Sequence, residues 1–223
     1  MIAHAATRIL LGERLGRPPE RLRFTRGRWG KPAVADSPGL HFSLSHSGEL
    51  ALLAVAPRPV GVDLELLGSG RDVERLSRRF FPDRERELVA RGGRPAFARL
   101  WTRKEACVKA SGGRLTEGLA LPVAHPVGQA TVHAPAPGGL AGPWRVADLP
   151  LPLPLPLPLP LPLPREHGRG PEQEREAEEE EEEEEYAGSV ALLGDGPFDV
   201  RWGVWYPGAP AGSGPKPPRQ GVK

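Results

Sequence analysis

The sequence has little cysteine and no long apolar run. Cys107 is the single cysteine among 223 residues, which excludes an internal disulfide and any cysteine-rich zinc site and favours a reducing compartment. No apolar run reaches the roughly 18 residues that cross a bilayer, and the first residues lack the basic and apolar segments of a secretion signal. We therefore expect a cytoplasmic protein with no membrane partner.

Charge is nearly balanced overall but unevenly distributed. The net charge is +2, yet residues 149–185 hold twelve acidic and three basic residues, which leaves 27 basic and 16 acidic residues elsewhere, a net charge of +11. A basic body attracts polyanionic ligands and acidic proteins. No zinc-finger, helix-turn-helix or aromatic-basic stacking pattern accompanies this charge, so nucleic acid is not an expected partner.

Two segments of low complexity interrupt the chain. Leu149–Pro164 consists of eight Leu-Pro dipeptides, in which every second residue lacks an amide hydrogen, so polyproline II is expected there. Glu178–Glu185 repels itself and is expected to be solvated. We interpret residues 149–185 as a disordered insertion and the Pro/Gly-rich residues 207–223 as a disordered tail.

Apolar periodicity and turn residues predict an α+β protein. A helix is expected over residues 5–16, ended by Gly16 and two prolines. The same signals predict strands at 22–25, 40–45, 50–56 and 60–66, helices at 72–81, 83–91 and 94–111, and short strands at 119–124, 130–134, 144–149, 187–193 and 198–206.

Two acidic residues, Asp63 and Glu65, alternate with Val62 and Leu64 in one predicted strand. Because side chains alternate faces along a strand, both carboxylates project from the same side while the apolar pair packs on the other. Their mutual repulsion is relieved by a divalent cation, and hard oxygen ligands suit Mg²⁺, or Mn²⁺ as an alternative. The pair predicts part of a metal site.

Glu105 is the candidate for a third carboxylate. It lies beside the apolar stripe that begins at Phe97 and Trp101, and the step from Glu105 to Lys109 spans one helical turn. Mg²⁺ usually completes its octahedron with waters and phosphate oxygens. Three carboxylates beside Lys104 and Lys109 therefore predict a site for a phosphoanhydride.

Each of these patterns also has an ordinary structural explanation. Alternating acids on a strand are usually a solvated face. Glu105 and Lys109 can form a plain surface pair worth a few tenths of a kcal/mol, and Ser45-His46-Ser47 can be a hydrogen-bonded turn. Trp101 and Cys107 are assigned to core packing.

Five motifs occur in order along the chain. They are Gly30-Lys31-Pro32, His41-Phe-Ser-Leu-Ser45-His46-Ser47, Gly61-Val-Asp63-Leu-Glu65, Phe80-Phe-Pro-Asp-Arg-Glu85 and Trp101-Thr-Arg-Lys104-Glu105-Ala-Cys-Val-Lys109. In kind and order these motifs resemble those of the 4′-phosphopantetheinyl transferases, specifically the longer monomeric type that activates carrier proteins of peptide and polyketide synthases. The resemblance covers about residues 5–150 and 186–206.

The resemblance implies a fold of two similar lobes in a pseudo-twofold arrangement, each a small antiparallel sheet with helices, with coenzyme A between them. The first lobe is expected over residues 1–57, and the second over residues 58–148 together with 186–206. The implied activity is that of a holo-[acyl-carrier-protein] synthase-type enzyme. It transfers the 4′-phosphopantetheine arm of coenzyme A to a serine of an apo acyl or peptidyl carrier protein, depends on Mg²⁺ and releases adenosine 3′,5′-bisphosphate.

The resemblance also implies a role for each matching residue. The metal ligands are Asp63, Glu65 and Glu105, of which Glu105 also draws the proton from the incoming serine. Lys109 stabilises the leaving diphosphate. The expected contacts to coenzyme A are Lys31 at the nucleotide end and Ser45, His46, Lys104 and Lys109 at the phosphates.

Two features depart from the family's pattern. Ser43 stands where the family has Asn. In the family a strand and a basic helical segment precede the stretch that resembles residues 5–16, so the first lobe is expected to be N-terminally incomplete. Two other functions therefore stay open, a catalytically impaired homologue that binds coenzyme A or a carrier protein, and an unrelated Mg²⁺-dependent phosphohydrolase.

Overall fold

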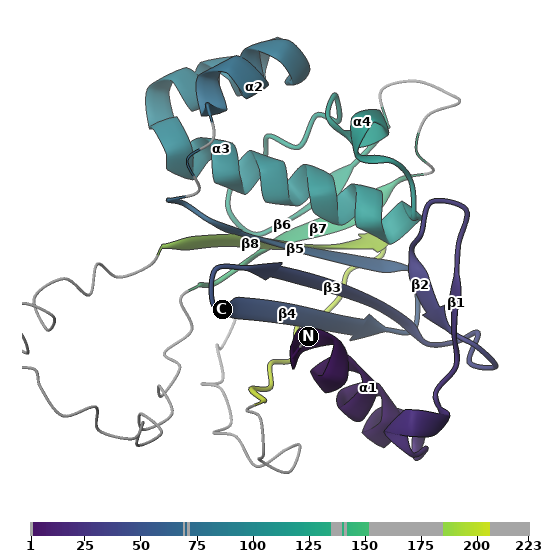
Figure 1. The fold of residues 1–223 in the computed structure, drawn as a ribbon. Coiled ribbons are helices and arrows are strands. Elements are labelled where there is room, and N and C mark those ends of the chain that lie inside the picture. The colour runs from purple at the N-terminus through teal and green to yellow at the C-terminus, as the bar shows by residue number, and fades with distance from the viewer. Residues whose placement is uncertain are drawn as a thin grey trace, which may run out of the picture.

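A four-stranded antiparallel sheet with a long helix across one face forms the centre of the fold (Figure 1). The structure is a computed structural model that describes residues 2–68, 70, 72–134, 140, 142–151 and 185–205. The strands follow the order β5-β8-β7-β6, so β5 lies at an edge of the sheet. Their bounds are Val60–Leu66 for β5, Gln129–Val132 for β6, Trp144–Leu149 for β7 and Tyr186–Leu193 for β8.

The helices above this sheet are α2 (Val73–Phe80), α3 (Asp83–Ser111) and the short α4 (Leu115–Gly118). α3 is interrupted at Gly93, whose φ of 57° is not helical. A glycine adopts this conformation at no steric cost, and Pro95 suits the first turn of a new helix segment. The two predicted helices, 83–91 and 94–111, are therefore confirmed as the two arms of α3.

The remaining elements lie on the other side of β5. A hairpin pairs β3 (His41–Ser47) with β4 (Leu50–Ala56), and a second hairpin pairs β1 (Phe24–Arg26) with β2 (Pro32–Val34). The helix α1 (Ile2–Leu15) lies below the first hairpin (Figure 1). It ends at Gly16, which has a φ of 61°, as the sequence predicts. A 3-10 turn, Pro19–Arg21, follows.

The largest apolar core lies between the helices and the four-stranded sheet. Phe81, Phe97 and Trp101 stack on one another there, with ring centroids 5.3 to 6.4 Å apart. Cys107 is fully buried in the same core, and burial raises the pKa of its thiol to about 12. The packing role predicted for Trp101 and Cys107 is confirmed.

The opposite face of the sheet carries a smaller cluster built on Val60, Val62, Val190 and Leu192. Apolar residues of β4 pack against this cluster, so the β3–β4 hairpin is fastened beneath the sheet. The architecture is mixed α and β with small antiparallel sheets, as expected. The pseudo-twofold relation between two lobes stays a prediction.

Several predicted elements differ from the structure. Residues 119–124 were expected to form a strand, but they have no regular secondary structure. The strand expected at 198–206 is also absent over residues 198–205, whereas β2 and α4 were not predicted. Most of the expected insertion, residues 152–184, and the expected tail lie outside the described residues. Among the described helices, none has both the length and the apolar character that a membrane crossing requires.

Candidate functional site

The strand β5 presents two acidic side chains to α3. Val62 packs in the cluster on the far face of the sheet, so Asp63 and Glu65 face the helix side, as strand alternation predicts. Asp63 is buried, with 3 % of its surface exposed, and Glu65 is half-buried. The arrangement confirms the predicted orientation of this strand.

Glu105 of α3 completes a group of three carboxylates. One oxygen each from Asp63, Glu65 and Glu105 can be chosen so that all three lie within 4.8 Å of one another. The ordinary interpretation, a solvated acidic face, does not fit a group whose central member is almost fully buried. Side chains from two elements therefore converge on one small volume.

Gly61 permits this convergence. A Cβ atom at this position would lie 2.0 Å from the carbonyl oxygen of Ala106 and 2.4 Å from the amide nitrogen of Ala110. Only a residue without a side chain allows the backbone of α3 to approach β5 so closely. The first glycine of the Gly-Val-Asp-Leu-Glu motif thus brings the helix near enough for Glu105 to reach the strand carboxylates.

Lys109 and Ser45 contact the deepest carboxylate. The Lys109 ammonium lies 2.6 Å from Asp63 Oδ1 and 3.8 Å from Glu105 Oε2. The Ser45 hydroxyl donates to Asp63 Oδ1 at 2.9 Å and accepts from Lys109 at 3.0 Å. Burial raises the pKa of Asp63, the neighbouring Glu65 adds to this effect, and Lys109 and Ser45 oppose it. The structure thus brings five of the predicted site residues together.

The residues fit a divalent cation. Asp63 Oδ2 is buried and has no hydrogen-bond partner among the described residues, which is costly for a carboxylate oxygen. Three carboxylates form the hard oxygen set that Mg²⁺ or Mn²⁺ prefers. Asp63, Glu65 and Glu105 are the residues that would hold the ion, with Asp63 Oδ2 as an oxygen that still needs a partner.

Lys104, predicted as a contact to coenzyme A, is enclosed in the core beneath α3. Its side chain is fully buried, and its ammonium lies 2.6 Å from Glu85 Oε2 and 4.6 Å from the centre of the Phe81 ring. It also donates to the carbonyl of Leu121. Glu85, the last residue of the Phe80–Glu85 motif, is its buried partner, and in this structure the ammonium of Lys104 is bound within the protein.

Lys31 is also placed differently from the prediction. Its ammonium donates to the carbonyl oxygens of Val60, Lys109 and Ala110, at 2.5 to 2.9 Å. An ammonium has three hydrogens, so these acceptors occupy all of them. Burial lowers the pKa of Lys31 to about 8. Lys31, the residue before β2, thus links this strand to the end of α3 and to β5, and its contact to a nucleotide stays a prediction.

His46 is exposed on β3. Because neighbouring residues on a strand face opposite sides, its ring points away from the side on which Ser45 meets Asp63. The structure therefore separates these two predicted phosphate contacts. His46 remains available to a ligand only along the outer face of β3.

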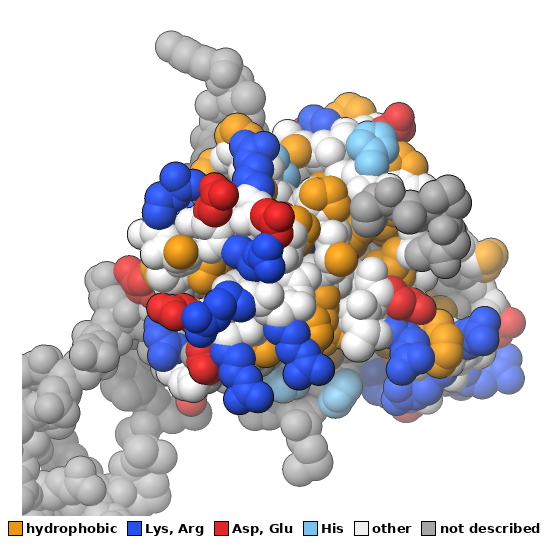
Figure 2. Space-filling view, turned by 90° about the horizontal axis from the view of Figure 1, so that it is seen from above, with side chains coloured by type: hydrophobic (Ala, Val, Ile, Leu, Met, Phe, Trp, Pro, Cys, Tyr) orange, Lys and Arg blue, Asp and Glu red, His pale blue; other side chains and the backbone are white. Residues whose placement is uncertain are grey.

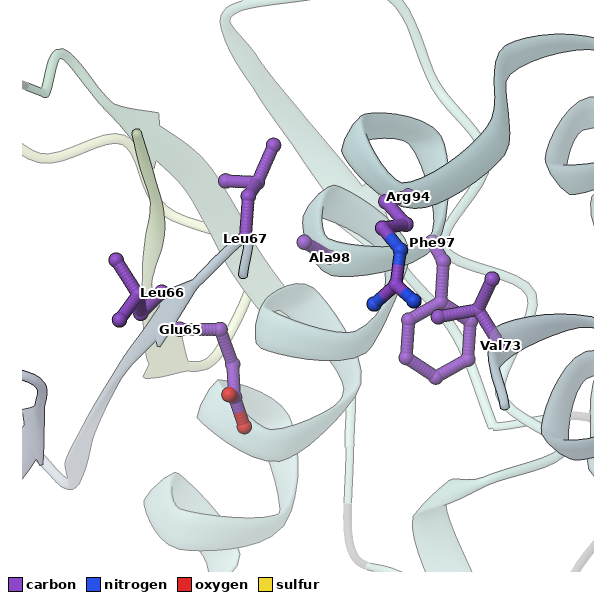
Figure 3. A pocket seen from close by; sticks show the side chains of 7 residues that line it. All are labelled: Glu65, Leu66, Leu67, Val73, Arg94, Phe97 and Ala98. Atoms are coloured by element: carbon purple, nitrogen blue, oxygen red, sulfur yellow. The ribbon is translucent and has the colours of Figure 1, made fainter. Parts of the chain in front are cut away.

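A small pocket adjoins the carboxylate group at Glu65. Apolar side chains line it, together with Arg94 at the start of the second arm of α3 (Figure 3). The residues that line it are Glu65, Leu66, Leu67, Val73, Arg94, Phe97 and Ala98. No sequence pattern predicts this pocket, because the residues that line it come from three separate elements. The cavity has a volume of only about 10 Å³, so it is a shallow hollow beside one carboxylate of the site.

Comparison with known proteins identifies the segment that contains this site. The family model of the 4′-phosphopantetheinyl transferase superfamily matches residues 59–138, the range that holds all three carboxylates and Lys109. The 4′-phosphopantetheinyl transferase HetI of Nostoc sp. is 43% identical over 113 residues, which are 47% of this chain and 48% of that protein.

Two further relatives agree. The 4′-phosphopantetheinyl transferase Sfp of Bacillus subtilis is 31% identical over 125 residues, or 51% of this chain and 53% of that protein. The 4′-phosphopantetheinyl transferase AcpT of Salmonella typhi is 40% identical over 115 residues, or 48% of this chain and 57% of that protein. The chain thus spans about half the length of the relatives it matches. Residues 59–138 of this chain therefore match the 4′-phosphopantetheinyl transferase superfamily, and the relatives named above are similar to the chain over about half of its length.

Proposed function

We propose that this chain transfers the 4′-phosphopantetheine arm of coenzyme A to a serine hydroxyl of an apo acyl or peptidyl carrier protein. The observation that carries the proposal is the convergence of Asp63, Glu65 and Glu105 beside Lys109, within the segment that matches the superfamily. The names of HetI, Sfp and AcpT support transfer of this group. The long, monomeric type and a cytoplasmic location are part of the proposal.

In this reaction the serine oxygen bonds to the phosphorus that carries the pantetheine arm. The bond from this phosphorus to the bridging oxygen breaks, and adenosine 3′,5′-bisphosphate leaves. A bound Mg²⁺ or Mn²⁺ supplies charge neutralisation at the diphosphate. The proton of the serine must go to a base, and Glu105 is the proposed acceptor, as the resemblance implies; its side chain is part-exposed, whereas that of Asp63 is enclosed.

Lys109 adds a second positive charge at the same place. Its ammonium is 30% exposed and already lies between two of the carboxylates. From there it can stabilise the negative charge that develops on the leaving diphosphate. Ser45 holds the side chains of Lys109 and Asp63 in place through its hydrogen bonds to both. His46 is the proposed contact to a phosphate on the outer face of β3.

The charge distribution supports an acidic protein partner. Figure 2 looks onto the face that carries α2 and α3 and shows Lys and Arg side chains gathered along one side, with acidic ones among them. Exposed arginines of these two helices are Arg75, Arg78, Arg79, Arg84, Arg91, Arg94 and Arg99. Such a surface favours an acidic carrier protein through long-range steering.

One observation favours a second candidate, a catalytically impaired homologue that only binds coenzyme A or a carrier protein. Lys31 and Lys104, two of the predicted coenzyme A contacts, have their ammonium groups bound within the protein. With two fewer cations available, the affinity for the cofactor is expected to be low. The complete group of carboxylates argues against this candidate, since a pure binder has no use for a metal set.

Mass spectrometry of the carrier protein tests the proposal. The purified chain is incubated with coenzyme A, Mg²⁺ and an apo carrier protein, and a mass gain of one phosphopantetheine arm is expected. Glu105→Ala should abolish this gain, and Glu87→Ala, an exposed site on the first arm of the same helix, should retain it. Binding of coenzyme A without mass gain would support the second candidate, and breakdown of coenzyme A without an acceptor would support a phosphohydrolase.

A further inference from the structure

The strand β3 lies alongside the edge strand β5, and the two strands share no backbone ladder. The two strands belong to separate sheets. Two hydrogen bonds nevertheless connect them with the same offset of 19 residues, from Val62 to Ser43 and from Leu66 to Ser47. The constant offset shows that the two strands run in the same direction. We call this contact the serine seam: β3 and β5 lie parallel and are joined by side-chain hydrogen bonds instead of backbone ones.

Serine hydroxyls close the seam. Ser43, Ser45 and Ser47 alternate along β3 and therefore share one face. Ser43 Oγ accepts from the Val62 amide at 3.1 Å, and Ser47 Oγ accepts from the Leu66 amide at 3.0 Å. The middle hydroxyl contacts Asp63. The outer two bind only backbone groups of β5 in these bonds.

The two anchored amides bracket the acidic pair. Asp63 and Glu65 lie between Val62 and Leu66, and among the described strands β5 pairs through its backbone with β8 alone, on the side away from β3. We propose that Ser43 and Ser47 are positioning residues for the metal site, which hold the strand that carries two of its three ligands. This inference rests on the proposed function, because the ion is the one that function requires.

The physical basis is preorganisation. A ligand set binds an ion tightly when the groups behind the ligands fix their positions, and loss of such support typically costs about 10-fold to 100-fold in metal affinity. Without its hydroxyl acceptor the buried Val62 amide loses its partner across the seam, which favours displacement of the strand. The position of Ser43 also explains how a smaller residue serves where the family has Asn, since one acceptor oxygen is sufficient for this bond.

The test measures Mn²⁺ binding by the full chain without coenzyme A or carrier protein, from the electron paramagnetic resonance signal of free Mn²⁺. Ser43→Ala/Ser47→Ala should raise the Kd for Mn²⁺ about 10-fold, and Ser43→Thr, which keeps a hydroxyl, should bind like the wild type. Ser77→Ala is the matched control, because Ser77 is a buried serine of α2 that donates to the carbonyl of Glu74. Its Kd should not change.

Hydrogen exchange gives a readout that needs no ion. The Val62 amide should exchange faster in Ser43→Ala, and the Leu66 amide faster in Ser47→Ala, while the amides of β7 keep their protection. An unchanged Mn²⁺ Kd in a double variant whose seam amides exchange faster would show a merely structural role and overturn the inference. Absence of Mn²⁺ binding in the wild type would instead overturn the proposed function, and the inference with it.

Discussion

The two regions of the molecule on either side of β5 differ in how much core they have. Among the described residues, the region above the sheet buries seventeen apolar residues in one cluster, whereas α1 and the two hairpins bury four, Leu11, Leu22, Val34 and Phe42. The carboxylates, Lys109 and the adjoining pocket all belong to β5 and the helices above it, or to the turn and helix start beside them. The better-packed region supplies the chemistry, and the other supplies serine hydroxyls and one lysine at its border.

Buried charge also distinguishes the regions. Glu85 pairs with Lys104, and its other oxygen accepts from the amides of Val123 and Ala124. Arg103 makes two bonds to Asp148 and donates to the carbonyls of Val123 and His125. These buried side chains supply hydrogen-bond partners to the backbone of residues 121–125, which is not part of a sheet. In the smaller region, by contrast, the pair between Arg23 and Asp36 is exposed.

The largest effect is expected from breaking the buried pair. Lys104→Met leaves the Glu85 carboxylate charged and enclosed, so the free energy of unfolding in urea should fall by about 3–5 kcal/mol. Arg23→Met, the matched change at the exposed pair, should cost less than about 0.5 kcal/mol. Equal losses in the two variants would show that the border at β5 does not separate regions of different stability.

An effect of similar or smaller size, confined to one region, is expected in the minor core. Leu11 is fully buried, and Leu11→Ala should cost about 2–5 kcal/mol. Because the cluster is small, this loss should release α1 while the sheet stays folded. Hydrogen exchange should then show loss of protection in α1 alone. Loss of protection in β7 and β8 to the same extent would mean that both regions unfold as one unit.

A weaker effect is expected from the lysine that joins the regions. Burial lowers the pKa of Lys31 from 10.5 to about 8, so between these values the unfolded chain binds more protons than the folded chain. Stability from this group therefore rises as the pH increases from about 8 to 10.5. Urea unfolding should show this rise in the wild type and not in Lys31→Met. Parallel pH profiles would show that the amine titrates normally.

The smallest effect is expected from removal of residues 152–184. Leu149 of β7 pairs with Gly188 of β8, so the ends on either side of the removed segment lie close together. A short Gly-Ser linker should connect them with a change in unfolding free energy within about 0.5 kcal/mol. Transfer to a carrier protein should persist, and at low salt it should rise because fewer acidic residues then repel an acidic partner. A deletion variant that does not fold would contradict the assignment of an insertion.

The carboxylate group was predictable because each ligand follows a simple periodicity. Strand alternation places Asp63 and Glu65 together, and helical spacing aligns Glu105 with Lys109. The same rule bears on Lys104, which the resemblance assigns to coenzyme A and the structure buries. Counted from Phe97, it falls seven residues on, in the apolar stripe itself, so helical spacing places it inside the core.

Other features depend on contacts that no local pattern encodes. Residues 119–124 have the composition of a strand, but their backbone groups bind to Glu85, Arg103 and Lys104 instead of a neighbouring strand. The hydrogen bonds that join Ser43 and Ser47 to β5 could not be predicted from the sequence either. Alternating serines at 43, 45 and 47 show which face they share, but only the folded structure shows that β5 lies opposite.

The close approach of α3 to β5 has a consequence for which ion the proposed site selects. A methyl group at residue 61 would collide with the backbone of α3. β5 and α3, the two elements that supply the carboxylates, therefore lie as close together as their backbones allow. A narrow separation suits the short bonds of about 2.0–2.1 Å that Mg²⁺ requires, and a wider one suits the longer bonds of Ca²⁺. Gly61, which has no side chain to bind an ion, would then influence which of these cations the site prefers.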